Sequence, residues 1–80
     1  MASGTYIQIG AFKQFVNAQE MRARANGAGL FGVTVDKGAT TSGESIYKVR
    51  VGPYENTARI DSALTKLRAA GIEDYKLISQ

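Results

Sequence analysis

Hydrophobic and polar residues alternate in several short stretches of this chain, and two of the stretches echo each other. Residues 7–12 read Ile-Gln-Ile-Gly-Ala-Phe, and residues 49–54 read Val-Arg-Val-Gly-Pro-Tyr. Both follow one order: β-branched, polar, β-branched, glycine, small, aromatic. Each stretch also precedes a polar segment and a helical pattern. Two such halves are too few for a repeat array, and they favour a duplicated strand–helix–strand plan.

Alternation with a period of two predicts four strands, at residues 5–9, 30–36, 46–51 and 75–79. One face of each of the first three strands is apolar and is predicted to point inward. This inward set comprises Ile7, Ile9, Phe31, Val33, Val35, Tyr47, Val49 and Val51. The polar, glycine-containing residues 37–45 are predicted to form a mobile loop. Pro53 is predicted to close the third strand, because proline cannot donate a hydrogen bond to a neighbouring strand.

The first helix has a strong start signal. Asn17 is predicted to cap it, and Glu20, three residues later, completes a capping box. Val16 and Met21 have the spacing of a hydrophobic staple. The stripe predicted to face the core holds Ala18, Met21 and Ala25.

The second helix is predicted to begin with Asn56 or Thr57 as its cap. Its apolar positions follow helical spacing, at Ile60, Ala63, Leu64 and Leu67. Glycine accepts the left-handed conformation that helix ends often need, so the helices are predicted to end at Gly27 and Gly29, and at Gly71.

The predicted order is β-α-β-β-α-β, which belongs to the α+β class. We expect a two-layer sandwich in which a four-stranded antiparallel sheet carries both helices on one face, as in RNP-like and ferredoxin-like folds. Met21, Leu64 and Leu67 are expected to pack on the inward strand residues. The other face of the sheet must then meet solvent or a partner.

Candidate binding residues gather on that open face. The first and third strands place Tyr6, Gln8, Ile46, Lys48 and Arg50 there, and the fourth strand adds Lys76 and Ile78 or their neighbours. An amide, cations, an aromatic ring and exposed aliphatics suit a ligand that is partly apolar and forms hydrogen bonds. The chemistry of the face alone leaves an ordinary solvated surface equally open.

Composition narrows the range of functions. The chain has 80 residues, suited to one domain, and it has no cysteine and no histidine. Disulfides, the usual zinc sites and Cys- or His-based catalysis are thereby excluded. The carboxylates are expected in caps, loops and helix faces, so no acid–base pair, metal site or cofactor site is predicted. The glycines at 27, 29 and 32 follow a helix and do not open one, unlike a phosphate-binding loop.

Charge and hydropathy add two further expectations. Ten Lys and Arg against seven Asp and Glu give a net charge of +3, a mild bias towards anionic partners. No apolar run approaches the ~20 residues that cross a bilayer, so no membrane contact by this domain is expected. Residues 1–4 are interpreted as a start segment or a leftover of cloning, and residues 5–80 as the binding domain.

Two separated motifs resemble those of the sporulation-related repeat (SPOR) family. Residues 6–12, Tyr-Ile-Gln-Ile-Gly-Ala-Phe, are similar to the family's aromatic-x-Gln-x-Gly-Ser-Phe. Residues 46–54, Ile-Tyr-Lys-Val-Arg-Val-Gly-Pro-Tyr, are similar to its Trp-Tyr-Arg-Val-Arg-Val-Gly-Pro-Phe. The likeness extends over residues 5–79. The chain departs from the pattern at Ala11, where serine is common, and at Ile46, where tryptophan is common.

The resemblance implies a non-catalytic module that binds bacterial peptidoglycan, notably septal glycan strands stripped of their stem peptides. It implies a place in the cell envelope, in the periplasm or cell wall at the septum, within a larger division protein, wall hydrolase or lipoprotein. By position, Gln8 matches the glycan-contacting glutamine, and Lys48 and Arg50 match the basic residues. The expected glycan-binding face is Tyr6, Gln8, Ala11, Ile46, Lys48, Arg50, Lys76 and Ile78.

Other classes of function remain as alternatives. The same layout underlies the RNA recognition motif, but the predicted third strand points no aromatic ring outward to stack a base, so no nucleic-acid partner is expected. A module that binds another protein is a further alternative. A regulatory domain that dimerises around a small metabolite would need a glycine-lined pocket, and the sequence identifies none.

Overall fold

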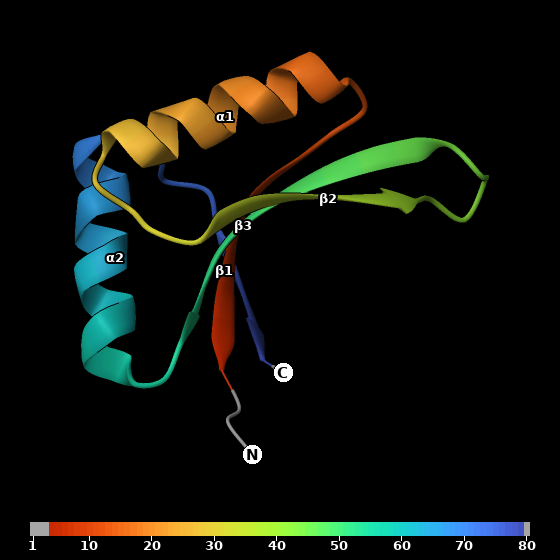
Figure 1. Ribbon diagram of the computed structural model, residues 1–80. Coiled ribbons are helices and arrows are strands. Elements are labelled where there is room, and N and C mark those ends of the chain that lie inside the picture. The colour runs from red at the N-terminus through yellow and green to blue at the C-terminus, as the bar shows by residue number, and fades with distance from the viewer. Residues whose placement is uncertain (1–3, 80) are drawn as a thin grey trace.

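The computed structural model describes residues 4–79 and has the predicted element order (Figure 1). The elements are β1 (Thr5–Phe12), α1 (Phe15–Gly27), β2 (Val33–Ala39), β3 (Ser45–Tyr54), α2 (Thr57–Ala69) and β4 (Lys76–Ser79). All strand pairs are antiparallel, in the order β2-β3-β1-β4. Both helices cover the same face of the sheet, as expected (Figure 1). The predicted start segment, residues 1–4, lies almost wholly outside the described residues.

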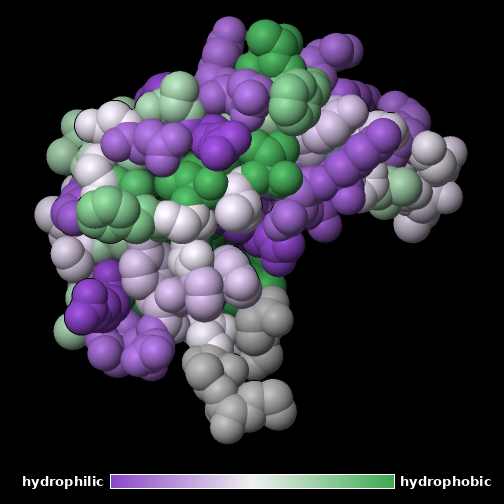
Figure 2. All heavy atoms as spheres, in the orientation of Figure 1, coloured by the Kyte–Doolittle hydropathy of each residue, from purple (hydrophilic) through white to green (hydrophobic). Residues whose placement is uncertain are grey.

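One apolar core joins the sheet to both helices. Its largest fully buried side chains are Ile7, Val49, Val51 and Leu67, each 0% exposed. Small residues on the helices bring the backbones close to the sheet, since Ala18, Ala25 and Ala63 are also buried. Predicted core residues that are only partly buried, but pack against this cluster, are Met21, Val35, Tyr47 and Leu64. Figure 2 shows apolar side chains between α1 and the sheet, beneath a more hydrophilic outer surface. No helix within residues 4–79 is long and apolar enough to cross a membrane.

Both helices end in the same Schellman motif. The N–H of Leu30 donates to the carbonyl of Ala25 (3.3 Å), and the N–H of Ile72 donates to that of Leu67 (2.9 Å). A glycine with positive φ precedes each donor, which is the usual geometry of this motif. The motif turns the next apolar residue into the core, so Leu30 and Ile72 are 5% and 4% exposed. The echo between the two halves of the sequence therefore extends to their helix ends.

This helix end corrects the prediction for the second strand. Leu30 belongs to the end of α1, and β2 begins three residues later and continues to Ala39. Phe31, predicted to point inward, is 85% exposed, because it follows the residue that the motif has turned into the core. The predicted loop at residues 37–45 is correspondingly shorter.

The start of α1 also differs from its prediction. The helix begins at Phe15 with Gln14 at the cap position, and no side chain caps it. The Phe15 ring packs edge-on against Tyr47, with ring centroids 5.4 Å apart, and this contact ties the start of the helix to the sheet. Asn17 therefore lies inside the first turn, and Val16 is 60% exposed and cannot act as a staple. Figure 2 shows apolar spheres at this exposed start of α1.

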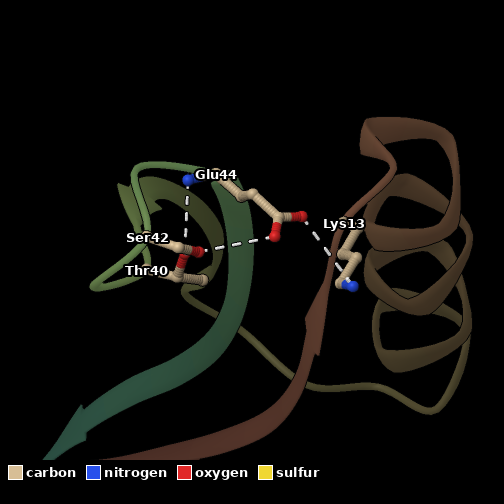
Figure 3. Close-up of polar contacts among 4 residues, drawn as sticks. All are labelled: Lys13, Thr40, Ser42 and Glu44. Atoms are coloured by element: carbon tan, nitrogen blue, oxygen red, sulfur yellow. Dashed lines mark hydrogen bonds and ion pairs between the residues drawn. The ribbon is translucent and has the colours of Figure 1, made fainter.

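The β2–β3 hairpin is long and closes through polar contacts (Figures 1 and 3). Across the turn, the Thr40 N–H donates to the Glu44 carbonyl (2.9 Å), and the Glu44 N–H donates to Thr40 Oγ1 (3.2 Å). Ser42 bridges the Thr40 hydroxyl and the Glu44 carboxylate. Lys13 Nζ lies 3.8 Å from Glu44 Oε2, so an exposed ion pair links the turn to the segment before α1.

β3 runs past its predicted end at Val51. It includes Gly52 and Pro53 and pairs with β1 as far as Tyr54, because a register shift between the pairs of Thr5 and Ile7 accommodates them. A bulge is a position where a strand tolerates proline. Tyr54 packs against the core, and this burial raises the pKa of its hydroxyl above the ordinary value.

The two helix starts yield a first prediction. Asn56 Oδ1 accepts a hydrogen bond from the Arg59 N–H (3.0 Å), which confirms the predicted cap of α2. Asn56→Ala is expected to lower the free energy of unfolding by about 1 kcal/mol, because this N–H loses its acceptor. Asn17→Ala is expected to leave it unchanged or slightly raised, since alanine is the better helix former. Urea denaturation measures both, and equal losses would contradict the assigned helix starts.

Candidate functional site

Cross-strand pairing places the predicted binding residues on one face. Gln8 of β1 lies opposite Arg50 of β3 on one side and Lys76 of β4 on the other. Tyr6 lies opposite Ile78. Residues directly opposite in an antiparallel pair share a face of the sheet. β4 therefore contributes Lys76 and Ile78 to the open face, and their neighbours point the other way.

Ala11 reaches this face through a bulge. Strict alternation from Ile9 would turn Ala11 towards the helices. Between Gln8 and Gly10, however, the register of β1 against β3 shifts, and Ala11 lies opposite Lys48. An extra residue in one strand reverses the alternation beyond it. The motif position carried over from the family thus lies on the open face, although periodicity alone would have placed it in the core.

A larger residue in place of Gly10 within this bulge would have to displace the ring of Phe12. A Cβ atom on Gly10 would lie 2.6 Å from the Phe12 ring, closer than such contacts allow. The ring of Phe12 covers Gly10 and packs against the core from the helix side. The order Gly-Ala-Phe in the first motif therefore has a structural reason: glycine admits the ring, and alanine faces outward.

An unpredicted carboxylate holds Arg50. The Arg50 Nε donates to Asp36 Oδ2 (2.8 Å), and its Nη2 donates to the same oxygen. The guanidinium carbon also lies 5.2 Å from the centroid of the Tyr6 ring, a cation–π arrangement. The carboxylates were predicted to lie in caps, loops and helix faces, whereas Asp36 lies on β2. Val35 was predicted to point inward, and side chains of a strand alternate. The position of Asp36 directly after Val35 therefore indicated the open face.

The other two cations on the face are less constrained. Lys48 and Lys76 are exposed, and neither forms an ion pair within the described part of the chain. Ile46 and Ile78 are partly buried at opposite ends of the face, on β3 and β4. The eight residues predicted for the site therefore share one surface, and Asp36 and Thr34 join them from β2.

A polar row crosses the whole sheet. The pairing register aligns Thr34, Arg50, Gln8 and Lys76 from four successive strands. At ~4.8 Å between neighbouring strands, the row is about 14 Å long. Its groups are a hydroxyl, a guanidinium, an amide and an ammonium. Such a row suits an extended ligand that presents anionic and hydrogen-bonding groups at intervals.

Comparison with known families decides the relationship. The SPOR domain family model matches residues 2–75, including both motifs. The chain belongs to the SPOR domain family. Its fold is similar to the crystal structure of the RlpA SPOR domain from Pseudomonas aeruginosa, with a TM-score of 0.84. The two are 23% identical, and the match covers 94% of this chain and 97% of that chain. No curated protein sequence matches the chain.

Membership of the SPOR family supports a peptidoglycan-binding module associated with the bacterial cell envelope and division. SPOR domains are binding modules, in keeping with the expected lack of catalysis. The third strand also differs from an RNA recognition motif, since its open-face residues are Ile46, Lys48 and Arg50, and Tyr47 packs against the core.

The Asp36–Arg50 pair leads to a second prediction. A double-mutant cycle with Asp36→Ala and Arg50→Ala is expected to give a coupling energy of roughly 0.5–1 kcal/mol in favour of folding. The value is modest because the side chains are 45% and 26% exposed. Urea denaturation of the four proteins measures it. A coupling energy of zero would mean that the pair does not hold Arg50 in solution.

Proposed function

We propose that the open face of this SPOR domain binds denuded glycan strands of septal peptidoglycan and so directs a parent envelope protein to the division site. The observation that carries the proposal is the polar row from Arg50 through Gln8 to Lys76, with Lys48 beside it. The row crosses all four strands of the sheet, which suits a linear polymer.

The chemistry of such a ligand complements the row. Removal of a stem peptide leaves a lactyl carboxylate on each muramic acid, and an ammonium group meets it through a charge-assisted hydrogen bond. Lys48 and Lys76 are the exposed cations for this role. Gln8, between Arg50 and Lys76, offers both a donor and an acceptor to acetamido and hydroxyl groups.

Arg50 has a different role in this proposal. Two of its N–H groups are directed at Asp36, and its guanidinium lies over Tyr6, so its remaining donors are held in a fixed orientation. A fixed donor loses little conformational entropy on binding. Arg50 correspondingly covers one face of the Tyr6 ring.

The two departures from the family pattern weaken specific contacts. Ala11 lies opposite Lys48 and offers no hydroxyl, and Ile46 offers an aliphatic surface in place of an aromatic ring. The apolar faces of the sugars and their acetyl methyl groups would therefore rest on Ile46 and Ile78. Affinity is expected to be modest, since polar groups on both partners must lose water.

The third prediction tests the face with a matched pair of lysines. Lys48→Ala is expected to weaken binding to amidase-treated sacculi by about 1–2 kcal/mol, or roughly five- to thirtyfold, because a carboxylate loses its partner. Lys37→Ala is the control: this exposed residue lies opposite Tyr47, on the helix side of the same hairpin. It is expected to bind like the unsubstituted domain. Co-sedimentation with treated and untreated sacculi provides the measurement.

Companion variants separate binding from folding. Gln8→Ala is expected to cost about 1 kcal/mol of binding free energy. Its melting temperature should hardly change, since Gln8 lies outside the core. Ile9 is a core residue and is 3% exposed. Ile9→Ala leaves a cavity where its side chain was, and should therefore lower the melting temperature. If folded Gln8, Lys48 and Arg50 variants all bind sacculi normally, the proposed face is wrong and a protein partner on the helix side is the better candidate.

The fourth prediction concerns catalysis. The proposed site offers one carboxylate, Asp36, which is already engaged by Arg50. No group of three potential metal ligands lies together among residues 4–79. Incubation of purified glycan strands with the domain is therefore expected to leave their length distribution unchanged, as measured by size-resolved chromatography. Shortened strands with highly purified protein would contradict a pure binding role.

A further inference from the structure

A groove lies where β1 extends beyond β4. β1 pairs with β3 along its full length, but its pairing with β4 ends at Gln8 opposite Lys76. Residues 9–12 have no strand beside them on that edge, and no backbone hydrogen bond joins them to residues 71–75 in the described structure. An unpaired strand edge presents N–H and C=O groups that a further strand can use.

The edge opens into a cavity of about 340 Å³. Ile9 and Phe12 line it from β1, Met21 from α1 and Ile72 from the segment before β4. A second cavity of about 210 Å³ shares Phe12 and Met21 and continues towards the start of α1. The groove therefore combines free backbone groups with an apolar surface.

Acidic residues line this groove, although the chain as a whole is positive. Glu73 and Asp74 line the larger cavity and Glu20 the smaller one. These are three of the seven acidic residues, in a chain of net charge +3. None of the three forms an ion pair within residues 4–79. Arg24 also lines both cavities, but its Nη2 donates to the Ala70 carbonyl (3.0 Å).

We propose that this groove binds an extended peptide that adds to β1 as a strand in line with β4 and turns both aliphatic and lysine side chains towards the cavity. Backbone hydrogen bonds to residues 9–12 would supply affinity, as in other cases of strand addition. Side chains of a strand alternate between faces, so one face of the peptide is turned towards the cavity. An aliphatic residue on that face would contact Met21, and lysines two residues before and after it would approach Glu73 and Asp74, which line the same cavity. The site lies at the sheet edge and is independent of the polar row proposed for glycan.

The fifth prediction uses a defined probe, the capped peptide Lys-Thr-Val-Thr-Lys-Thr carrying a fluorophore, in which Lys, Val and Lys share one face of the strand. In amide-resolved NMR of the complete 80-residue domain, it is expected to shift the signals of residues 9–12 and of Glu73 and Asp74. The same peptide with N-methyl groups on alternate backbone nitrogens is expected to bind at least about tenfold more weakly, because it lacks the donors of a strand. Equal binding of the two peptides would overturn strand addition.

Charge reversal provides the matched control. Glu73→Lys with Asp74→Lys is expected to weaken peptide binding by about tenfold in fluorescence anisotropy, by loss of attraction and added repulsion. Glu55→Lys with Asp61→Lys changes the net charge equally at exposed positions outside both cavities, and is expected to have less than a twofold effect. Equal weakening by both pairs, or NMR shifts confined to Gln8 and Lys48, would overturn the proposal. If circular dichroism shows that the variant with Glu73→Lys and Asp74→Lys is misfolded, the comparison of the two peptides on the unsubstituted domain still tests strand addition.

Discussion

β1 and β3 pair along the middle of the sheet, and their inward side chains, Ile7, Val49 and Val51, are completely buried beneath the helices. A domain of this size forms one core, so both helices must cover the face that these strands present. The outward side chains of the same strands are thereby left uncovered. Burial on one side of the central pair thus determines which residues are available on the other.

Much of this arrangement could be predicted, because a half-buried strand records its two faces as alternating residues. Gln8, Lys48 and Arg50 were placed on the open face on that basis, and residue type narrowed the cap of α2 to Asn56 or Thr57. The exceptions arose at two places where the alternation of side chains is interrupted, one by an extra residue in a strand and the other by the end of a helix. The bulge moves Ala11 outward, and the Schellman motif buries Leu30 while Phe31 faces solvent. Local periodicity carries no signal of either event.

Interactions between strands were harder to predict than the strands themselves. Asp36 meets Arg50 only because β2 pairs with β3 in one register, which depends on the length of the turn between them. The free edge of β1 likewise depends on where β4 begins. Neither the pair nor the edge is encoded in a contiguous motif. The family relationship supplied Ala11 and the ligand class, and the structure supplied the partners of each side chain.

The ion pair between Asp36 and Arg50 also sets the effective charge of the open face. Lys48, Lys76 and Arg50 carry three positive charges, and Asp36 removes one of them, which leaves two. Mobile ions screen exposed charges within about 10 Å at 0.1 M ionic strength. Added salt would therefore weaken the attraction between this face and a polyanion. The loss would be that expected for a surface with two positive charges and not three. The hydrogen bonds of Gln8 and the fixed donors of Arg50 would carry a growing share of the binding as screening increases.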